Sequence, residues 1–230
     1  MEANLEILYE DDYIIAINKP AGLLVHRSKL ARDVKEFALQ MLRNQVGQHV
    51  TPIHRLDRKT SGVLLFAKQQ EFVNGFQTVL QEEKTQKTYI AVVRGFFTNE
   101  IVVDHPLINE AGKKQDAFTK FRLLQQIEIP LAHGKFQTSR YSIIEALPKT
   151  GRMHQIRKHL NHLRHPIIGD RPHGCNKQNA LFLKEFKLEK MLLHAKSLEL
   201  RHPFLDENLK IEAGFPEHFH AMMEKLGFKI

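Results

Sequence analysis

Short apolar stretches separated by polar turns predict that strands make up much of this chain. Residues 5–9 alternate in part and residues 13–17 are rich in β-branched side chains, with the polar turn of residues 10–12 between them, so the pair indicates a β-hairpin. Residues 63–67 and 89–93 are continuous apolar runs, which are typical of buried strands.

The middle of the chain and part of its C-terminal third are also strand-like. Residues 101–144 show this character throughout, with short turns at Gly112 and Gly134. Residues 192–193 and 198–200 indicate further strand. The sequence therefore predicts a large β component.

Apolar residues that recur three or four positions apart predict several helices. The first is expected to begin at Asp33, where Glu36 could complete a capping box, and to end at Gly47. The others have their apolar positions within residues 72–80, 153–163 and 219–226.

Strands and helices follow one another without a regular βαβ alternation, which favours an α+β fold with a largely antiparallel sheet. No long Pro/Gly/Ser tract, internal repeat or low-complexity segment interrupts the chain. We therefore expect residues 1–230 to form a single domain with no appended module.

The charge balance bears on the binding partner rather than on the fold. Lys and Arg total 34 against 26 Asp and Glu, which gives a net charge of +8 and a pI of about 9.5. An excess of this size suggests an anionic partner such as nucleic acid, although many enzymes are basic without binding a polyanion.

Cysteine usage and the apolar runs bear on where the protein works. A single cysteine, Cys175, excludes an intramolecular disulfide and a cysteine-based zinc site, and it fits a reducing cytosol. The N-terminus lacks the layout of a signal peptide, and the apolar runs are far shorter than the ~20 residues that span a bilayer. We expect a cytoplasmic protein that does not contact membranes.

Motifs for common cofactors are absent. The sequence contains no G-x-G-x-x-G, Walker A, G-x-S-x-G or H-E-x-x-H motif, so nucleotide-cofactor binding, that type of serine hydrolase and a zinc protease have no support. His154, His159, His162 and His165 invite a metal hypothesis. No nearby carboxylate completes a familiar ligand spacing, and the segment is crowded with Arg and Lys, so we expect no metal there.

Three segments carry candidate chemistry. His54–Gly62 places Asp57 in a cationic, turn-forming stretch before a buried strand, which could also be a salt-bridged surface loop. Lys87–Gly95 carries Tyr89 at the start of a strand, where tyrosine is ordinary. Lys149–Leu160 has a glycine before a basic helix, which suits phosphate contact but also describes a solvated helix face.

Taken together and in order, these segments resemble the signature motifs of the RluA-like pseudouridine synthases: H-R-L-D-x-x-T-S-G, K-x-Y-x-A-x-V-x-G and G-R-x-H-Q-I-R-x-H. The resemblance covers nearly the whole chain. It implies an RNA-modifying isomerase that uses no cofactor, metal or energy source. It also implies a mixed, mostly antiparallel sheet with flanking helices and a central RNA-binding cleft. The chain has no room for the S4 RNA-binding module that many members carry.

Softer features resemble the members of this family that act on uridine 65 of tRNA. These features are the stretches Leu24–Ser28, Gly47–Val50, Leu163–Asp170, Leu193–Ala195 and His202–Phe204. They imply tRNA as the partner and a protein that acts as a monomer. A family member that modifies ribosomal RNA or another tRNA site is the alternative.

The resemblance also implies catalytic roles for three residues. Asp57 is the required carboxylate, which either attacks the ribose or removes a ribose proton to give a glycal-like intermediate. Arg157 matches the arginine that pairs with that carboxylate, because a guanidinium can bind a carboxylate through two parallel hydrogen bonds. Tyr89 matches the tyrosine that stacks on the target base and could handle the C5 proton.

Substrate-binding roles follow for a second set of residues. The target uridine must leave its stack to reach a buried aspartate, and Arg55 matches the residue that fills the vacated space. Ile156 and Leu193 are expected to line the uracil pocket, although both would also suit an ordinary core. The remaining substrate-binding candidates are His54, Arg152, His154 and Gln155.

Two other classes of protein stay open at this point. A non-catalytic RNA-binding protein of the same fold would bind RNA without modifying it. A metal-dependent nuclease would use Asp57, Asp170 and the histidines, and a chelator would abolish its activity. The full set of matched motif residues argues against both.

Overall fold

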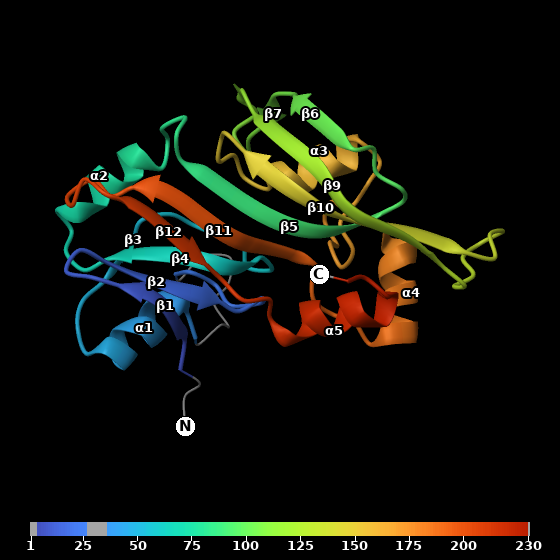
Figure 1. Cartoon of the computed structure of the whole chain (residues 1–230), viewed down its shortest axis with the longest axis horizontal. Coiled ribbons are helices and arrows are strands. Elements are labelled where there is room, and N and C mark those ends of the chain that lie inside the picture. The colour runs from blue at the N-terminus through green and yellow to red at the C-terminus, as the bar shows by residue number, and fades with distance from the viewer. Residues whose placement is uncertain (1–3, 27–35, 230) are drawn as a thin grey trace. The chain divides into compact units, whose positions relative to one another are not determined.

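The computed structural model describes residues 4–26 and 36–229 of the chain (Figure 1). The chain forms two compact units, each assembled from two separate stretches. Unit 1 comprises the residues up to Lys87 together with Ala195–Gly214, and unit 2 comprises Thr88–His194 together with the residues from Phe215 onward. The expectation that residues 1–230 act as one catalytic domain stays a prediction.

The described residues of unit 1 form two helices and several short strands. Its elements are β1 (Glu6–Glu10), β2 (Ile14–Lys19), α1 (Ala38–Val46), β3 (Thr51–Pro52), β4 (Ser61–Ala67), α2 (Phe72–Val79), β12 (Asn208–Glu212) and most of β11 (Leu193–Arg201). Antiparallel pairing joins β1 to β2, β2 to β4, β3 to β4, and β11 to β12. The predicted hairpin of residues 5–17 is thus confirmed.

Asp11 forms the turn of that hairpin. Its Oδ1 accepts hydrogen bonds from the backbone N–H groups of Tyr13 and Ile14, both at 2.7 Å. An aspartate that binds the backbone two and three residues ahead is a common way to close a tight turn. The polar turn that separates the two apolar stretches therefore has a direct structural cause.

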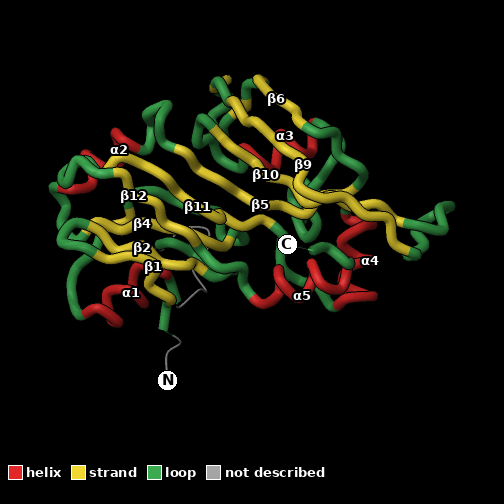
Figure 2. Tube along the Cα trace, viewed as in Figure 1, coloured by secondary structure: helices red, strands yellow, loops and turns green. Residues whose placement is uncertain are grey.

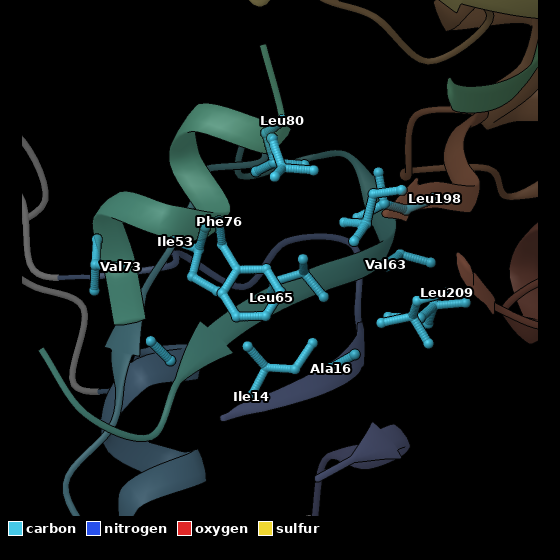
Figure 3. Close-up of a cluster of buried hydrophobic side chains, with 14 of the residues drawn as sticks. Ile14, Ala16, Ile53, Val63, Leu65, Val73, Phe76, Leu80, Leu198 and Leu209 are labelled. Atoms are coloured by element: carbon cyan, nitrogen blue, oxygen red, sulfur yellow. The ribbon is translucent and has the colours of Figure 1, made fainter. Parts of the chain in front are cut away.

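The core of unit 1 follows from the two-residue period of its strands. On one face, Ile14 and Ala16 of β2 and Val63 and Leu65 of β4 pack together with Phe76 of α2 (Figure 3). The alternate residues of both strands, such as Ile17 and Leu64, are also fully buried. Burial on both faces explains why residues 63–67 are apolar throughout.

Helix α1 ends where the sequence predicts. Gly47 takes a left-handed conformation with φ 66°, and its N–H bonds the carbonyl of Arg43. Gln45 ties the helix to the residue before β1 through two hydrogen bonds with the backbone of Leu5, at 2.8 and 2.9 Å. The expected start at Asp33 lies outside the described residues.

Unit 2 contains the longer strands. Its elements are β5 (Gln86–Arg94, from Thr88 onward), β6 (Glu100–Asp104), β7 (Leu107–Ile108), β8 (Lys114–Gln115), β9 (Phe118–Ile129), β10 (Ser139–Pro148), α3 (Gln155–His162), α4 (Asn176–Phe186) and α5 (Glu217–Leu226). The order β5-β10-β9-β6 is antiparallel throughout, and β7 and β8 form a separate small hairpin.

Helices cover both faces of the unit 2 sheet. Ile90 and Ile143 face a cluster that includes Phe182 of α4 and Phe219 of α5. The neighbouring residues in each strand, such as Ala91 and Ile144, face the other way, toward Ile156 and Leu160 of α3. Because successive side chains alternate between faces, one strand contributes to both cores.

The observed fold confirms the α+β class with a mostly antiparallel sheet, and strands outweigh helices in the trace of Figure 2. Residues 192–193 and 198–200, which indicated separate strand stretches, belong to or adjoin the single strand β11. Helix α4 and strand β12 were not predicted. The central RNA-binding cleft stays a prediction. No helix in the described part of the chain is long and apolar enough to cross a membrane.

Gly62, directly after the Asp57 loop, has no room for a side chain. Its φ is 110°, and a Cβ there would overlap the carbonyl oxygen of Ala195 and lie 2.8 Å from that residue's nitrogen. We expect Gly62→Ala to lower the free energy of unfolding by about 3 kcal/mol, because steric overlap adds to the backbone cost. Urea unfolding measures the change.

Gly47→Ala is the matched control in the same unit. Gly47 also has a positive φ, but no atom lies within 4 Å of the place where a Cβ on this residue would stand. We expect this variant to lose only about 1 kcal/mol, which is the backbone cost alone. Equal losses in the two variants would contradict the close approach of Gly62 to Ala195.

Candidate active site

The loop between β3 and β4 presents Asp57. Leu56 and Thr60 are buried on either side, while Asp57 is half-buried and Arg55 is exposed. The N–H of Thr60 bonds the carbonyl of Asp57 at 3.0 Å, which closes a turn directly before β4. The loop is therefore anchored at both ends, and Asp57 lies half-buried between the anchors.

A buried lysine binds the backbone of this loop. The ammonium of Lys19, at the end of β2, is fully buried and donates to the carbonyls of Pro20 and Leu23, both at 2.9 Å, and of Arg58 at 3.2 Å. The Arg58 carbonyl also accepts from the N–H of Gly22 at 2.8 Å, and the Arg58 Nε donates back to the Gly22 carbonyl at 2.9 Å. These bonds join the turn after β2 to the residue next to Asp57.

Lys19 also places a titratable cation near the candidate carboxylate. Burial lowers the pKa of Lys19 to about 7, and the negative charge of Asp57 acts in the opposite direction. The charge of Asp57 thus favours the protonated form of Lys19, which is the form that can donate all three hydrogen bonds.

His54 anchors the start of the same loop. Its Nε2 accepts a hydrogen bond from the backbone N–H of Leu65 in β4 at 3.2 Å. Burial, with a smaller contribution from the charge of Lys87, lowers the pKa of His54 to about 4. The imidazole is therefore neutral at physiological pH, and it positions the loop against the strand.

In unit 2, three of the predicted site residues share one apolar cluster. Ile156 and Leu193 are buried members of it, and the half-buried Tyr89 packs against it. They come from α3, from the start of β11 and from β5. The structure therefore brings together the tyrosine and both residues expected at the uracil pocket.

The segment before α3 is held by the amide of Gln155, which is almost fully buried. Its Oε1 accepts from Thr150 Oγ1 at 2.7 Å and from the N–H of Arg152 at 3.0 Å. Its Nε2 donates to the Phe118 carbonyl and to Thr119 Oγ1, both at 2.9 Å. The side chain of Gln155 thus ties the turn before α3 to strand β9.

Arg152 and His154 lie shortly before that glutamine in the chain, and each has different neighbours. Arg152 is half-buried, and its Nε donates to the carbonyl of Asp116, next to β8, at 2.9 Å. His154 takes a left-handed conformation with φ 58° at the start of α3, and its Nδ1 lies 2.8 Å from Nε2 of His173. A non-glycine residue in this conformation is uncommon and occurs often at functional sites.

Arg157, in the first turn of α3, forms a buried ion pair with Asp170. Its Nε donates to Asp170 Oδ2 at 2.8 Å and its Nη2 donates to Oδ1 at 2.7 Å. The exposed fractions are 4% for Arg157 and 1% for Asp170, so water does not screen the pair. This bidentate geometry fixes the plane of the guanidinium.

The four histidines considered as metal ligands have separate surroundings. His154 contacts His173, His159 lies between Thr119 and the carbonyl of His105, His162 stacks on the His105 ring, and His165 contacts the carbonyl of Arg94. In the described residues, no group of three or more histidine, cysteine, aspartate or glutamate side chains could hold a metal ion. The pairing of Asp170 with Arg157 also argues against the nuclease hypothesis, which needs that carboxylate as a ligand.

The predicted site residues thus fall into two groups. His54, Arg55 and Asp57 belong to unit 1, and the other seven belong to unit 2. The predicted pairing of Arg157 with Asp57 stays a prediction. From the sequence, Asp170 was considered only as a ligand of the nuclease alternative, whereas in the structure it is the partner of Arg157.

The comparisons with known proteins agree with this set of motifs. Residues 13–162 match the family model described as RNA pseudouridylate synthase. The chain is 44% identical to the tRNA pseudouridine synthase C of Vibrio cholerae, with 98% of this chain and 97% of that protein covered. It is 41% identical to the protein of that name from Haemophilus influenzae, with 98% and 99% covered.

Solved structures show the same architecture. The human RNA pseudouridylate synthase domain containing 4 superimposes with a TM-score of 0.73 at 25% identity, with 98% of this chain and 94% of that chain covered. The human RNA pseudouridylate synthase domain containing 1 has a TM-score of 0.72 at 23% identity, with 94% and 87% covered. The chain therefore belongs to the RNA pseudouridylate synthase family. Its activity is that of an RNA pseudouridine synthase, an isomerase that converts uridine in RNA to pseudouridine.

The lowered pKa of His54 predicts a pH dependence of stability. In the unfolded chain a histidine titrates near pH 6.5, and in the folded protein His54 titrates at about 4, so the unfolded state binds more protons between these values. His54 therefore contributes to a loss of unfolding free energy as pH falls from about 6.5 to 4.

We expect His54→Asn to make the acid side of the stability curve shallower over that range, as measured by urea unfolding at a series of pH values. His220→Asn, at an exposed histidine of α5, is the control and should leave the slope unchanged. The same slope in wild type and His54→Asn would show that His54 is not buried as a neutral imidazole.

Proposed function

We propose that this enzyme isomerises uridine 65 of tRNA to pseudouridine, with Asp57 as the catalytic carboxylate. The observation that supports tRNA as the substrate is the end-to-end similarity to several proteins named tRNA pseudouridine synthase C, at 41–45% identity. The net charge of +8 supports an RNA partner, because Lys and Arg bind the phosphate backbone. A ribosomal RNA substrate is the alternative.

The reaction needs a nucleophile or base that is held still beside the ribose. The bond between ribose C1′ and uracil N1 breaks, the uracil rotates, and a bond forms between C1′ and C5, which then loses its proton. Asp57 either attacks the sugar or removes a sugar proton. Its support is the loop geometry: buried residues on both sides, the hydrogen bond from Lys19 to the Arg58 carbonyl, and the half-buried position of Asp57 itself.

Arg157 and Tyr89 complete the proposed catalytic set. Arg157 pairs with Asp57 and orients its carboxylate, as the family motif implies. Tyr89 stacks on the uracil and handles the C5 proton. Its support is that the ring is half-buried against the cluster that contains Ile156 and Leu193, the residues proposed to line the uracil pocket.

The remaining residues divide between RNA contact and positioning. Arg55, which is exposed, fills the space that the flipped uridine leaves, and Arg152 and His154 contact the RNA beside α3. Gln155 and His54 remain candidates for substrate contact, and both also support the site. Hydrogen bonds from Gln155 hold the turn before α3, and the bond between His54 and the backbone of β4 holds the loop that carries Asp57.

The proposal includes a cytoplasmic location, where tRNA is modified, and a monomeric enzyme that uses no cofactor. The single cysteine, Cys175, is in keeping with a reducing compartment. The monomeric state rests on the family resemblance alone, and sedimentation analysis of the purified protein tests it.

Release of tritium from uridine C5 tests the catalytic proposal. We expect the protein to release tritium to water from unmodified tRNA labelled at C5 of its uridines, in the presence of a chelator. Asp57→Asn should abolish this release, because an amide is neither a nucleophile nor a base at neutral pH, and should leave tRNA binding intact. Release that survives Asp57→Asn would contradict the role of Asp57.

A substituted tRNA tests the site of modification. We expect a transcript with cytidine at position 65 to release no tritium above background, because pseudouridine can form only from uridine. A transcript with cytidine in place of another stem uridine serves as the control and should react normally. Undiminished release from the position-65 variant would remove this target, and release from ribosomal RNA alone would support the alternative substrate.

A further inference from the structure

The loop that follows α3 contains a carboxylate with no role in the reaction described above. Asp170 is almost completely buried, and its two oxygens bind Nε and Nη2 of Arg157 in parallel. Removal of a charged group from water is costly, and a buried pair is seldom a source of net stability. A buried ion pair at the residue that the motif assigns to catalysis therefore points to function.

The surrounding turn is built to hold the Asp170 carboxylate in place. The Asp170 carbonyl accepts from Nδ2 of Asn179 in α4 at 2.7 Å, and Oδ1 of Asn179 accepts from the N–H of Gly169 at 2.9 Å. The Asn179 side chain thus binds the backbone of Gly169 and the backbone of Asp170 together. The N–H of His173 adds a hydrogen bond to Asp170 Oδ1 at 3.3 Å.

The contacts of Asp170 fix the orientation of the Arg157 guanidinium as well as balance its charge. A guanidinium is planar, so two parallel bonds from its Nε and Nη2 edge leave it no rotation about its long axis. Nη1 is the nitrogen that takes no part in these two bonds. Because the two bonds fix the plane of the guanidinium, they also fix the direction of the Nη1 N–H groups. A single contact to a carboxylate would not impose that constraint.

We propose that Asp170 is a positioning residue for the pseudouridine synthase reaction, which fixes the orientation of the Arg157 guanidinium for its role in that reaction. This inference rests on the proposed function of Arg157. Asp170 touches neither RNA nor the reacting atoms, and it acts only through Arg157. Its loss should therefore slow the chemical step and leave RNA affinity unchanged.

A double-mutant cycle separates this role from a general structural one. Single-turnover rate constants for tritium release, and dissociation constants for unmodified tRNA, are measured for wild type, Asp170→Asn, Arg157→Gln and the double variant. We expect Asp170→Asn to lower the rate constant about 10²-fold with tRNA affinity unchanged, because small displacements of a catalytic group cost about that much. In the Arg157→Gln background, Asp170→Asn should have almost no further effect.

Two further variants complete the experiment. Asp104→Asn, at an exposed carboxylate of the same unit, controls for the loss of a negative charge and should react at the wild-type rate. Asp170→Glu keeps the charge but displaces it by one methylene, so it should fold and still react slowly. If thermal unfolding shows that Asp170→Asn is not folded, the same cycle with Asp170→Glu distinguishes the positioning role from a general structural one.

Additive effects of the Asp170 and Arg157 changes, or a wild-type rate in a folded Asp170 variant, would overturn the inference. A loss confined to tRNA affinity would overturn it too, since a positioning role predicts a change in the chemical step. Failure of the wild-type protein to release tritium would instead count against the proposed function, so the two failures are distinguishable.

Discussion

A buried cation with all of its hydrogen bonds made determines the geometry of the Asp57 loop. The Lys19 ammonium lies out of reach of water, and three backbone carbonyls from the turn after β2 and from Arg58 surround it. A buried ammonium without such partners would destabilise the fold by several kcal/mol. Burial of Lys19 therefore favours the loop conformation that places the Arg58 carbonyl beside its ammonium.

The second unit applies the same constraint to a different group. The buried guanidinium of Arg157 requires a carboxylate, and the turn at Gly169 and Asp170, bound by Asn179 of α4, supplies it in a fixed orientation. In unit 1 the buried cation and its partners hold the backbone next to Asp57, and in unit 2 the buried cation is Arg157 itself, so each constraint acts on a residue that the family motifs assign to catalysis. Such rigidity suits a reaction without a cofactor, in which the placement of a few side chains must supply most of the rate acceleration.

The sequence predicted those parts of the fold that depend on local pattern. The hairpin of residues 5–17 follows from alternation and the Asp11 turn, and the strand at residues 63–67 follows from its continuous apolar run. Helix α4 escaped prediction because it is mostly polar and buries only Gln178 and Phe182 within its span. The role of Asp170 escaped it because the partner, Arg157, is 13 residues away and only the folded turn brings them together.

The motifs located the candidate catalytic residues, but only the folded chain shows the support that the buried amide of Gln155 gives to the turn before α3. The central claim is that this chain modifies one uridine of tRNA through Asp57. Its most direct test is to map pseudouridine in all RNA from a strain that lacks the gene, after complementation with the intact protein or with Asp57→Asn. The account predicts that the intact protein alone restores pseudouridine at position 65 of tRNA. Restoration by Asp57→Asn, or restoration only in ribosomal RNA, would contradict it.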